Sequence, residues 1–173
     1  MRNGWISIAV GVLLAACSSS PAPQRPAQHG NNVAEPDSSL MRLVQLNQRM
    51  ASEADHEVVG FIQADTAHQY AQCQQGAWVT RTTRVEGGEH PKMTESYHAK
   101  MKIYTLSGKL LQDIEGDYTV GNGEMPLGIE YAIRELYRGE SGIIVAPWHA
   151  AFGVDGNGNI EPYMNVKIEI TID

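Results

Sequence analysis

The chain has 173 residues, and its 13 Lys and Arg residues against 20 Asp and Glu residues give a net charge of −7 at pH 7. This acidic balance, with no basic patch among aromatic residues, argues against nucleic acid as a partner. The 6 histidines show neither H-x-H nor H-x-x-x-H spacing, so no metal site is predicted. The sequence contains no G-x-S-x-G or phosphate-loop motif, and no cofactor is expected.

Residues 1–16 have the pattern of a secretory signal peptide. Arg2 precedes an apolar run from Trp5 to Ala16 that is too short to span a bilayer comfortably. The ending Leu14-Ala15-Ala16-Cys17 resembles the bacterial lipobox, which implies cleavage before Cys17 and lipid on that cysteine. An ordinary signal peptide with a chance cysteine is the alternative. Lipid on Cys17 would anchor the protein to a bacterial membrane in the cell envelope, with its domain facing the periplasm or the exterior.

Residues 17–37 are rich in Ser, Pro, Ala and Asn, with Val33 as their only large apolar residue. Such a stretch buries too little surface to offset the entropy of ordering it, so a flexible tether is predicted. The globular part then begins at Ser38, and its roughly 135 residues suit one domain. If Cys17 is lipidated, Cys73 stands alone, which excludes an internal disulfide. Cys73 lies in a polar stretch with no histidine at a set spacing, which argues against a role as nucleophile.

Residues 38–75 are predicted to form an N-terminal helical segment, which Ser38 or Ser39 can cap. The segment is too long for one ordinary helix, so a break is expected near Ala51–Asp55 or at Gly60. A packing or spacing element is the favoured interpretation, and a dimerisation helix is the alternative. The apolar residues that recur at three- and four-residue spacings are Leu43, Val44, Leu46, Met50, Ala54, Val58, Phe61 and Ile62.

Residues 76–173 change to a period of two and are predicted to form one domain. A helix over 124–140 interrupts the strands, with Pro126 in its first turn and Gly139 after its last. One short amphipathic helix among antiparallel strands indicates an α+β fold, with the helix packed on one face of a curved sheet. The helix carries its stripe on Ile129, Ala132, Ile133 and Leu136, and the expected strands are 77–85, 97–104, 109–114, 117–121, 141–146 and 165–172.

The stretch Asp155-Gly-Asn-Gly-Asn159 can be tested as a calcium loop. Asp155, Asn157 and Asn159 suit positions 1, 3 and 5 of an EF-hand, but Ile160 and Val166 stand where glycine and glutamate are needed. Asn and Gly tolerate positive φ angles, so a tight turn is predicted instead.

Four features of the second half resemble FKBP-type peptidyl-prolyl isomerases. These are Gly139-Glu140 after the helix, Pro147 followed by Ala151-Phe152-Gly153, then Ile160-Glu161-Pro162, and the alternating strand Val166 to Ile172. With the lipobox and the helical segment, the chain is similar to FKBP-like lipoproteins associated with gliding motility. The resemblance implies an FKBP-like fold and an apolar pocket that isomerises X–Pro bonds.

The resemblance also implies which residues form the pocket. Phe152 matches an aromatic wall that is tyrosine in many members, and Gln112 stands where active members carry aspartate, with Asp113 one residue later. Pro126 lacks the N–H that would bind substrate. Plain core positions are the alternative for Met101, Leu111, Ile129 and Ile168. The catalytic candidates are Phe152, Gln112 and Asp113, and the substrate-binding candidates are Met101, Leu111, Met125, Pro126, Ile129, Ile160 and Ile168.

Two functions follow from these observations. The first is a lipid-anchored isomerase that assists the folding of extracytoplasmic proteins by acting on their proline-containing segments. The second is a catalytically weak FKBP-like binding or chaperone lipoprotein in an envelope complex. The aspartate missing at Gln112 and the tryptophan missing at Ile129 favour the second, and the intact loop spacing around Phe152 favours the first.

Overall fold

The structure is a computed structural model, and it describes residues 38–173, which form one compact unit. The predicted signal peptide, lipidation site and tether lie in residues 1–37, outside the described residues. The elements are α1 (Ser38–Ala64), β1 (Ala71–Gln72), η1 (Gln74–Gly76), β2 (Trp78–Arg81), β3 (Ser96–Thr105), β4 (Leu110–Thr119), α2 (Leu127–Ile133), β5 (Ser141–Ala146), η2 (Trp148–Ala150) and β6 (Val166–Ile172).

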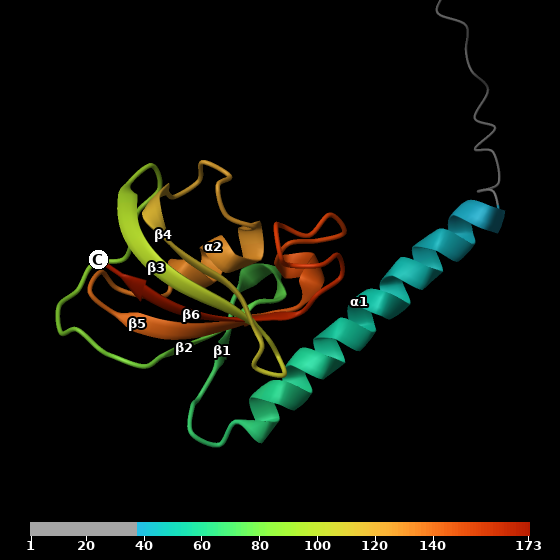
Figure 1. Cartoon of the computed structure of the whole chain (residues 1–173), viewed down its shortest axis with the longest axis horizontal. Coiled ribbons are helices and arrows are strands. Elements are labelled where there is room, and N and C mark those ends of the chain that lie inside the picture. Colours follow the sequence, from blue (N-terminus) through green and yellow to red (C-terminus); the bar gives the residue numbers. More distant parts are fainter. Residues whose placement is uncertain (1–37) are drawn as a thin grey trace, which may run out of the picture. The chain divides into compact units, whose positions relative to one another are not determined.

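The strands form one six-stranded sheet in the order β1-β2-β5-β6-β3-β4 (Figure 1). Every pair of neighbours is antiparallel, as the alternating strand pattern predicts. The expected α+β architecture, a curved antiparallel sheet with a helix on one face, is therefore confirmed. The separate strand expected over 117–121 is wrong, because β4 runs unbroken from Leu110 to Thr119 against β3.

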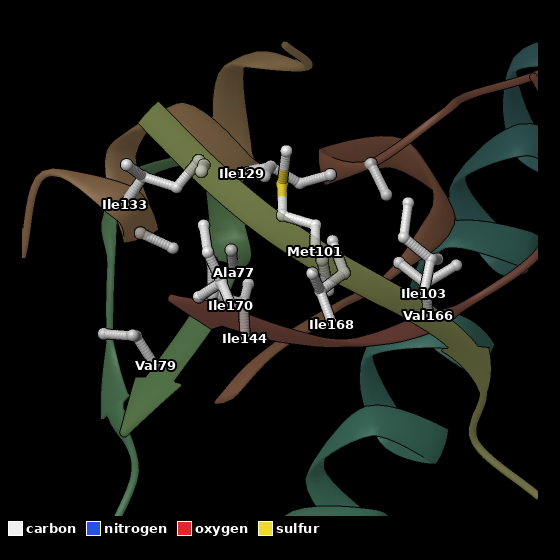
Figure 2. Packing of buried hydrophobic residues seen from close by; sticks show 14 of the residues in the cluster. Ala77, Val79, Met101, Ile103, Ile129, Ile133, Ile144, Val166, Ile168 and Ile170 are labelled. Atoms are coloured by element: carbon white, nitrogen blue, oxygen red, sulfur yellow. The ribbon is translucent and has the colours of Figure 1, made fainter. Parts of the chain in front are cut away.

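The core lies between α2 and the inner face of the sheet. Ile129, Ile133 and Leu136 are fully buried, so the predicted stripe is correct. On β6 the side chains at Val166 and Ile168 point into the same core (Figure 2). Each such aliphatic side chain contributes about 1.5–3 kcal/mol when it is buried.

The helix expected over 124–140 is shorter, because α2 ends at Ile133 and the chain tightens there. The N–H of Leu136 bonds to the carbonyl of Ile133 at 3.0 Å, three residues back, as in a closing 3₁₀ turn. Gly139 (φ +84°) is therefore not the residue that follows the helix. It leads into Glu140, a buried carboxylate that accepts the N–H groups of Val85 and Tyr137 and pairs with Arg81.

The long helix α1 spans 27 residues without a break. The break expected near Ala51–Asp55 or at Gly60 is wrong, since a single exposed glycine costs a helix only about 0.5–1 kcal/mol. Only Ala54 and Val58 are buried, where α1 contacts β5 and η2. The helix ends before residue 75, because Asp65 turns the chain: its carboxylate accepts the N–H of Ala67 at 3.0 Å.

The segment after Phe152 is a tight turn, as predicted. Asn157 and Ile160 exchange two backbone hydrogen bonds of 2.9 Å. Gly156 has φ +68°, and a Cβ there would lie 2.2 Å from the carbonyl oxygen of Ile160. Only glycine therefore fits at this position.

Candidate functional site

A cavity of about 280 Å³ lies between the sheet, the start of α2 and the loop after η2. Its volume is near the lower end of small-molecule pockets, which suits one small ring and its neighbouring amide better than a large ligand. Apolar side chains are the majority in the lining, and four residues bring polar groups: Gln112, Tyr118, Glu124 and Asn157. The lining residues are Met101, Ile103, Gln112, Ile114, Tyr118, Glu124, Met125, Ile129, Phe152, Asn157 and Ile168.

The floor of the cavity is part of the core. Met101 on β3, Ile168 on β6 and Ile129 on α2 are each at most 1% exposed, and all three reach the cavity. Figure 2 shows these side chains gathered between the sheet and α2. The pocket and core interpretations of these residues are thus compatible, because one side of each side chain packs and the other faces the cavity.

Phe152 also lines the cavity and contributes an aromatic wall. It is half-buried and packs against the core cluster. Two small alanines precede it, and Ala150 lies so close to α2 that a Cβ on Gly128 would come within 2.5 Å of its carbonyl oxygen. The small residues before Phe152 therefore let its loop contact the helix backbone directly.

The structure brings six of the predicted residues to the cavity and places four elsewhere. Phe152, Gln112, Met101, Met125, Ile129 and Ile168 line it. Leu111 and Ile160 are buried in the core and do not line the cavity. Pro126 precedes α2, and its carbonyl accepts the N–H of Glu130 at 2.9 Å. Asp113 lies on the other face of the sheet beside Lys102, 4.0 Å away.

Gln112 and Asp113 point to opposite faces of the sheet because successive side chains of a strand alternate. Just before them, the pairing of β3 with β4 is irregular. Ile103 pairs with Gln112, and Tyr104 pairs with Leu110, so Leu111 is an extra residue in the ladder. The Nε2 of Gln112 donates to the carbonyl of Asn157, and the Nδ2 of Asn159 donates to the carbonyl of Leu111 at 3.2 Å. These two bonds fasten the turn after Phe152 to β4.

Sequence reasoning missed Ile103, Ile114, Tyr118, Glu124 and Asn157. In β4, Gln112, Ile114 and Tyr118 follow a period of two and face inward. This pattern was not visible because two separate strands, 109–114 and 117–121, were expected in place of one. Tyr118 matters most, since no side chain or carbonyl in residues 38–173 bonds its hydroxyl. Its ring lies over Gly116, with the hydroxyl 3.7 Å from where a Cβ would be.

The electrostatics of the cavity centre on Tyr118 and Glu124. Burial raises the pKa of Tyr118, and the nearby carboxylate of Glu124 adds to the shift. Glu124 accepts the N–H of Thr119 at 3.0 Å and the amide of Asn122 at 2.7 Å, and these bonds lower its pKa. The tyrosine hydroxyl therefore keeps its proton at neutral pH and is available as a donor.

The loop that carries Phe152 is tied to α1 at two points. The side-chain oxygen of Asn165 accepts the N–H of Trp148 at 2.9 Å, while its amide donates to Glu57 at 2.6 Å. His149 contacts Asp55 at 3.0 Å. The middle of α1 is thus joined to the wall of the cavity.

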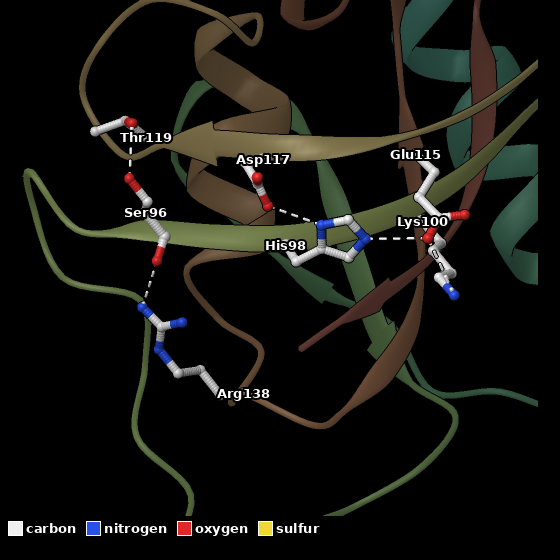
Figure 3. Close-up of polar contacts among 7 residues, drawn as sticks. All are labelled: Ser96, His98, Lys100, Glu115, Asp117, Thr119 and Arg138. Carbon is white, nitrogen blue, oxygen red and sulfur yellow. Dashed lines mark hydrogen bonds and ion pairs between the residues drawn. The ribbon is translucent and has the colours of Figure 1, made fainter.

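The opposite face of the sheet is polar and carries a larger hollow of about 620 Å³. Its charged side chains pair with one another: His98 bonds to Asp117 at 2.8 Å and to Glu115 at 3.1 Å, and Lys100 also reaches Glu115 (Figure 3). Because these charges are already paired, we place the candidate site on the inner face.

The site contains no arrangement for covalent chemistry. Within residues 38–173, no three His, Cys, Asp or Glu side chains come together as metal ligands would. Burial raises the pKa of the Cys73 thiol to about 11, which disfavours the nucleophilic thiolate. What the arrangement offers is an apolar cavity with one free hydroxyl donor.

Comparisons with solved structures define the fold. The chain is similar to a peptidyl-prolyl cis-trans isomerase from Pseudomonas syringae pv. tomato, with a TM-score of 0.58 and 18% identity over 70% of this chain and 92% of that one. It is also similar to the three FKBP domains of wheat FKBP73, with a TM-score of 0.56 and 14% identity over 61% of this chain and 49% of that one.

The described domain therefore has the FKBP-type fold, as the sequence resemblance predicted. No protein-family model matches the chain. No curated protein matches it either. None of the helices in residues 38–173 combines the length and apolar character that a membrane crossing requires.

Proposed function

We propose that this chain is an FKBP-type peptidyl-prolyl isomerase that acts on proline-containing segments of extracytoplasmic proteins. The observation that carries the proposal is the apolar cavity between Phe152 and the floor formed by Met101, Ile129 and Ile168. The likeness to solved isomerases supports the fold on which such a cavity is built.

The cavity suits a reaction that needs no covalent step. The barrier to rotation about a peptide bond is about 18–20 kcal/mol, and it falls if the twisted amide is bound better than the planar one. The twisted amide has lost its resonance and is less polar at oxygen, so a dry apolar site favours it. The floor would take the proline ring, Phe152 would cover it, and the hydroxyl of Tyr118 would donate to a carbonyl of the substrate.

A second function, binding without efficient catalysis, has specific observations in its favour. Gln112 is held by Asn157 and is not free for substrate. Pro126 has no N–H to donate, and Phe152 has no hydroxyl. An FKBP-like binding or chaperone module in an envelope complex would keep the apolar cavity but would isomerise X–Pro bonds slowly.

A protease-coupled isomerisation assay on residues 38–173 separates the two functions. The isomerase proposal expects faster cis-to-trans conversion of a proline tetrapeptide, and Phe152→Ala should abolish the gain. Asp113→Asn, on the opposite face of the sheet, is the matched control and should leave the rate unchanged. Proline-peptide binding without acceleration would support the binding module, and the absence of both would overturn the two proposals.

The membrane anchor is a separate proposal that rests on the sequence of residues 14–17. In the native host, Cys17→Ser should move the protein from the membrane fraction to the soluble fraction. A variant that stays in the membrane fraction with unchanged gel mobility would contradict lipidation. The similarity to gliding-motility lipoproteins stays a prediction.

A further inference from the structure

The amino-terminal half of α1, residues 38–52, exposes a large apolar surface. Leu40, Met41, Leu43, Val44 and Leu46 are each between 49% and 58% exposed. In Figure 1 this half of the helix extends away from the sheet. Five neighbouring large side chains in contact with water are unusual for a stable surface helix.

The exposed residues continue the stripe that the domain buries. Ala54 and Val58 are covered by the part of the domain that holds β5 and η2. Leu40, Leu43 and Val44 fall on the same side of the helix, at steps of three and four residues, and nothing in residues 38–173 covers them. The apolar stripe therefore runs along most of α1, but the domain covers only its second half, at Ala54 and Val58.

The exposed apolar surface is wider than a helix-to-helix contact needs. At about 100° per residue, Met41 and Leu46 flank the stripe on either side and extend it to an arc of about 220°. The uncharged Ser39, Asn47 and Gln48 also lie within this arc, which contains no charged residue. A two-helix contact uses a much narrower seam. A broad arc of this kind is suited to immersion in an apolar medium.

Charge separates the amino-terminal half of α1 from the rest of the unit. Residues 38–52 contain Arg42 and Arg49 and no acidic residue, while residues 53–173 contain 18 acidic and 9 basic residues. Arg42 and Arg49 are seven residues apart and share one side of the helix, away from the stripe. The helix thus presents a largely apolar arc and a polar face whose only charges are positive, next to an acidic domain.

We propose that the amino-terminal half of α1 lies in the surface of an anionic membrane. The apolar arc would enter the boundary between headgroups and acyl chains, and Arg42 and Arg49 would contact lipid phosphates, which is the arrangement of interfacial amphipathic helices. The acidic domain would be repelled by the same lipids and stay in water. This inference does not depend on isomerase activity.

Vesicle flotation of residues 38–173 tests the proposal, because this unit contains the whole core and lacks Cys17. Binding is expected to vesicles of phosphatidylglycerol and phosphatidylethanolamine, and to weaken with salt. Phosphatidylcholine vesicles should bind much less. Arg42→Gln with Arg49→Gln should lower partitioning by roughly 10- to 30-fold, given two basic residues near an anionic surface.

Leu43→Gln with Val44→Gln should abolish binding to both kinds of vesicle. Gln45→Asn with Gln48→Asn, a polar double change in the same turns, is the matched control and should bind like the wild type. None of these variants should change the melting temperature or peptide isomerisation, because the changed side chains are exposed. If the Leu43→Gln, Val44→Gln variant bound vesicles as well as the wild type does, the proposal would be overturned.

Analytical ultracentrifugation of the same proteins tests the alternative that a second copy of the chain covers the exposed apolar surface. A wild-type dimer that Leu43→Gln with Val44→Gln dissociates, without any vesicle binding, would assign the surface to a second copy and overturn the membrane proposal. A monomer that binds no vesicles would overturn it as well.

Discussion

The side-chain amide of Gln112 donates a hydrogen bond to the main-chain carbonyl of Asn157 at 2.6 Å, joining β4 to the turn that follows Phe152. The neighbouring glycine makes this approach possible, because a Cβ on Gly158 would lie 2.8 Å from the same amide nitrogen. This bond therefore holds the turn after Phe152 against β4 at the cavity, which both residues line.

Gln112→Leu should remove this tie while keeping the side-chain volume. We expect the free energy of unfolding to fall by about 0.5–1.5 kcal/mol, the usual net contribution of one hydrogen bond. Amide exchange in residues 155–160 should also become faster, which hydrogen-exchange mass spectrometry can measure. The control Asp113→Asn should change neither the free energy of unfolding nor the amide exchange. Equal effects of both variants would contradict this role of Gln112.

Phe152 should affect binding more than stability. Phe152→Ala should cost less than the roughly 3–5 kcal/mol of a full core truncation, because the ring is only half-buried. The folded variant should lose most of its proline-peptide binding, as isothermal titration would show. A full core-sized loss of stability with binding retained would make Phe152 a plain core residue.

Phe152→Tyr adds a hydroxyl without reducing volume. Stability should stay nearly unchanged, and any isomerase activity should rise, because the cavity gains a second hydrogen-bond donor. The coupled isomerisation assay measures this directly. If wild type and variant are both inactive while both bind proline peptides, the binding-module function is favoured.

Tyr118→Phe removes the one hydroxyl at the cavity that has no partner in the described residues. Since no protein bond is lost, thermal stability should stay the same. Affinity for a proline peptide should fall by roughly 2- to 12-fold, which corresponds to the usual 0.5–1.5 kcal/mol of one hydrogen bond. Unchanged affinity and rate would show that the hydroxyl does not touch the ligand.

Glu140 should be among the most sensitive positions for folding. Its buried carboxylate accepts the N–H groups of Val85 and Tyr137 and lies 3.2 Å from Arg81. Glu140→Ala leaves those groups without partners, and we expect a loss of about 3–5 kcal/mol in urea unfolding. The exposed Glu86→Ala is the control. Similar unfolding midpoints for both would contradict the assignment.

His98 should make stability depend on pH. Its bonds to Asp117 and Glu115 raise its pKa above the ordinary value of 6.5. Its contribution is therefore fully present below the unfolded-state pKa and is lost as pH rises through the folded-state pKa. Urea unfolding of wild type and His98→Gln should differ at low pH and converge at alkaline pH. A difference that grows with pH would contradict this sign.

The core was predictable because it depends on local periodicity. The pairing between strands that are distant in the sequence was not predictable. The stripe around Ile129 and the alternation around Ile168 are visible in the sequence because each depends on neighbours a few residues away. The bulge at Leu111 was not predictable, because an extra residue exists only relative to the pairing of β4 with β3. The continuity of α1 was also hidden, because packing of Val58 outweighs the weak local preference against Gly60.

The candidate site was predictable where residue type sufficed. Phe152 stands out as an aromatic residue among small ones, and the structure places it at the cavity. Tyr118 does not stand out, because its significance comes from a hydroxyl left without a partner in the folded domain. Ile160 and Leu111 have the right chemistry for a pocket, but both are buried in the core and do not line the cavity.

Two side-chain contacts, Asn165 with Glu57 and His149 with Asp55, connect α1 to the loop of Phe152 at the cavity. At 1.5 Å per residue the 27 residues of α1 reach about 40 Å, with no hinge along the way. Glu57 bonds to Asn165, which holds the backbone of Trp148, and Asp55 bonds to His149, so the middle of α1 and the loop of Phe152 are held together. Under the proposed function, a surface that binds Leu40 and Leu43 at the far end of α1 would therefore also orient the loop of Phe152 toward its substrate.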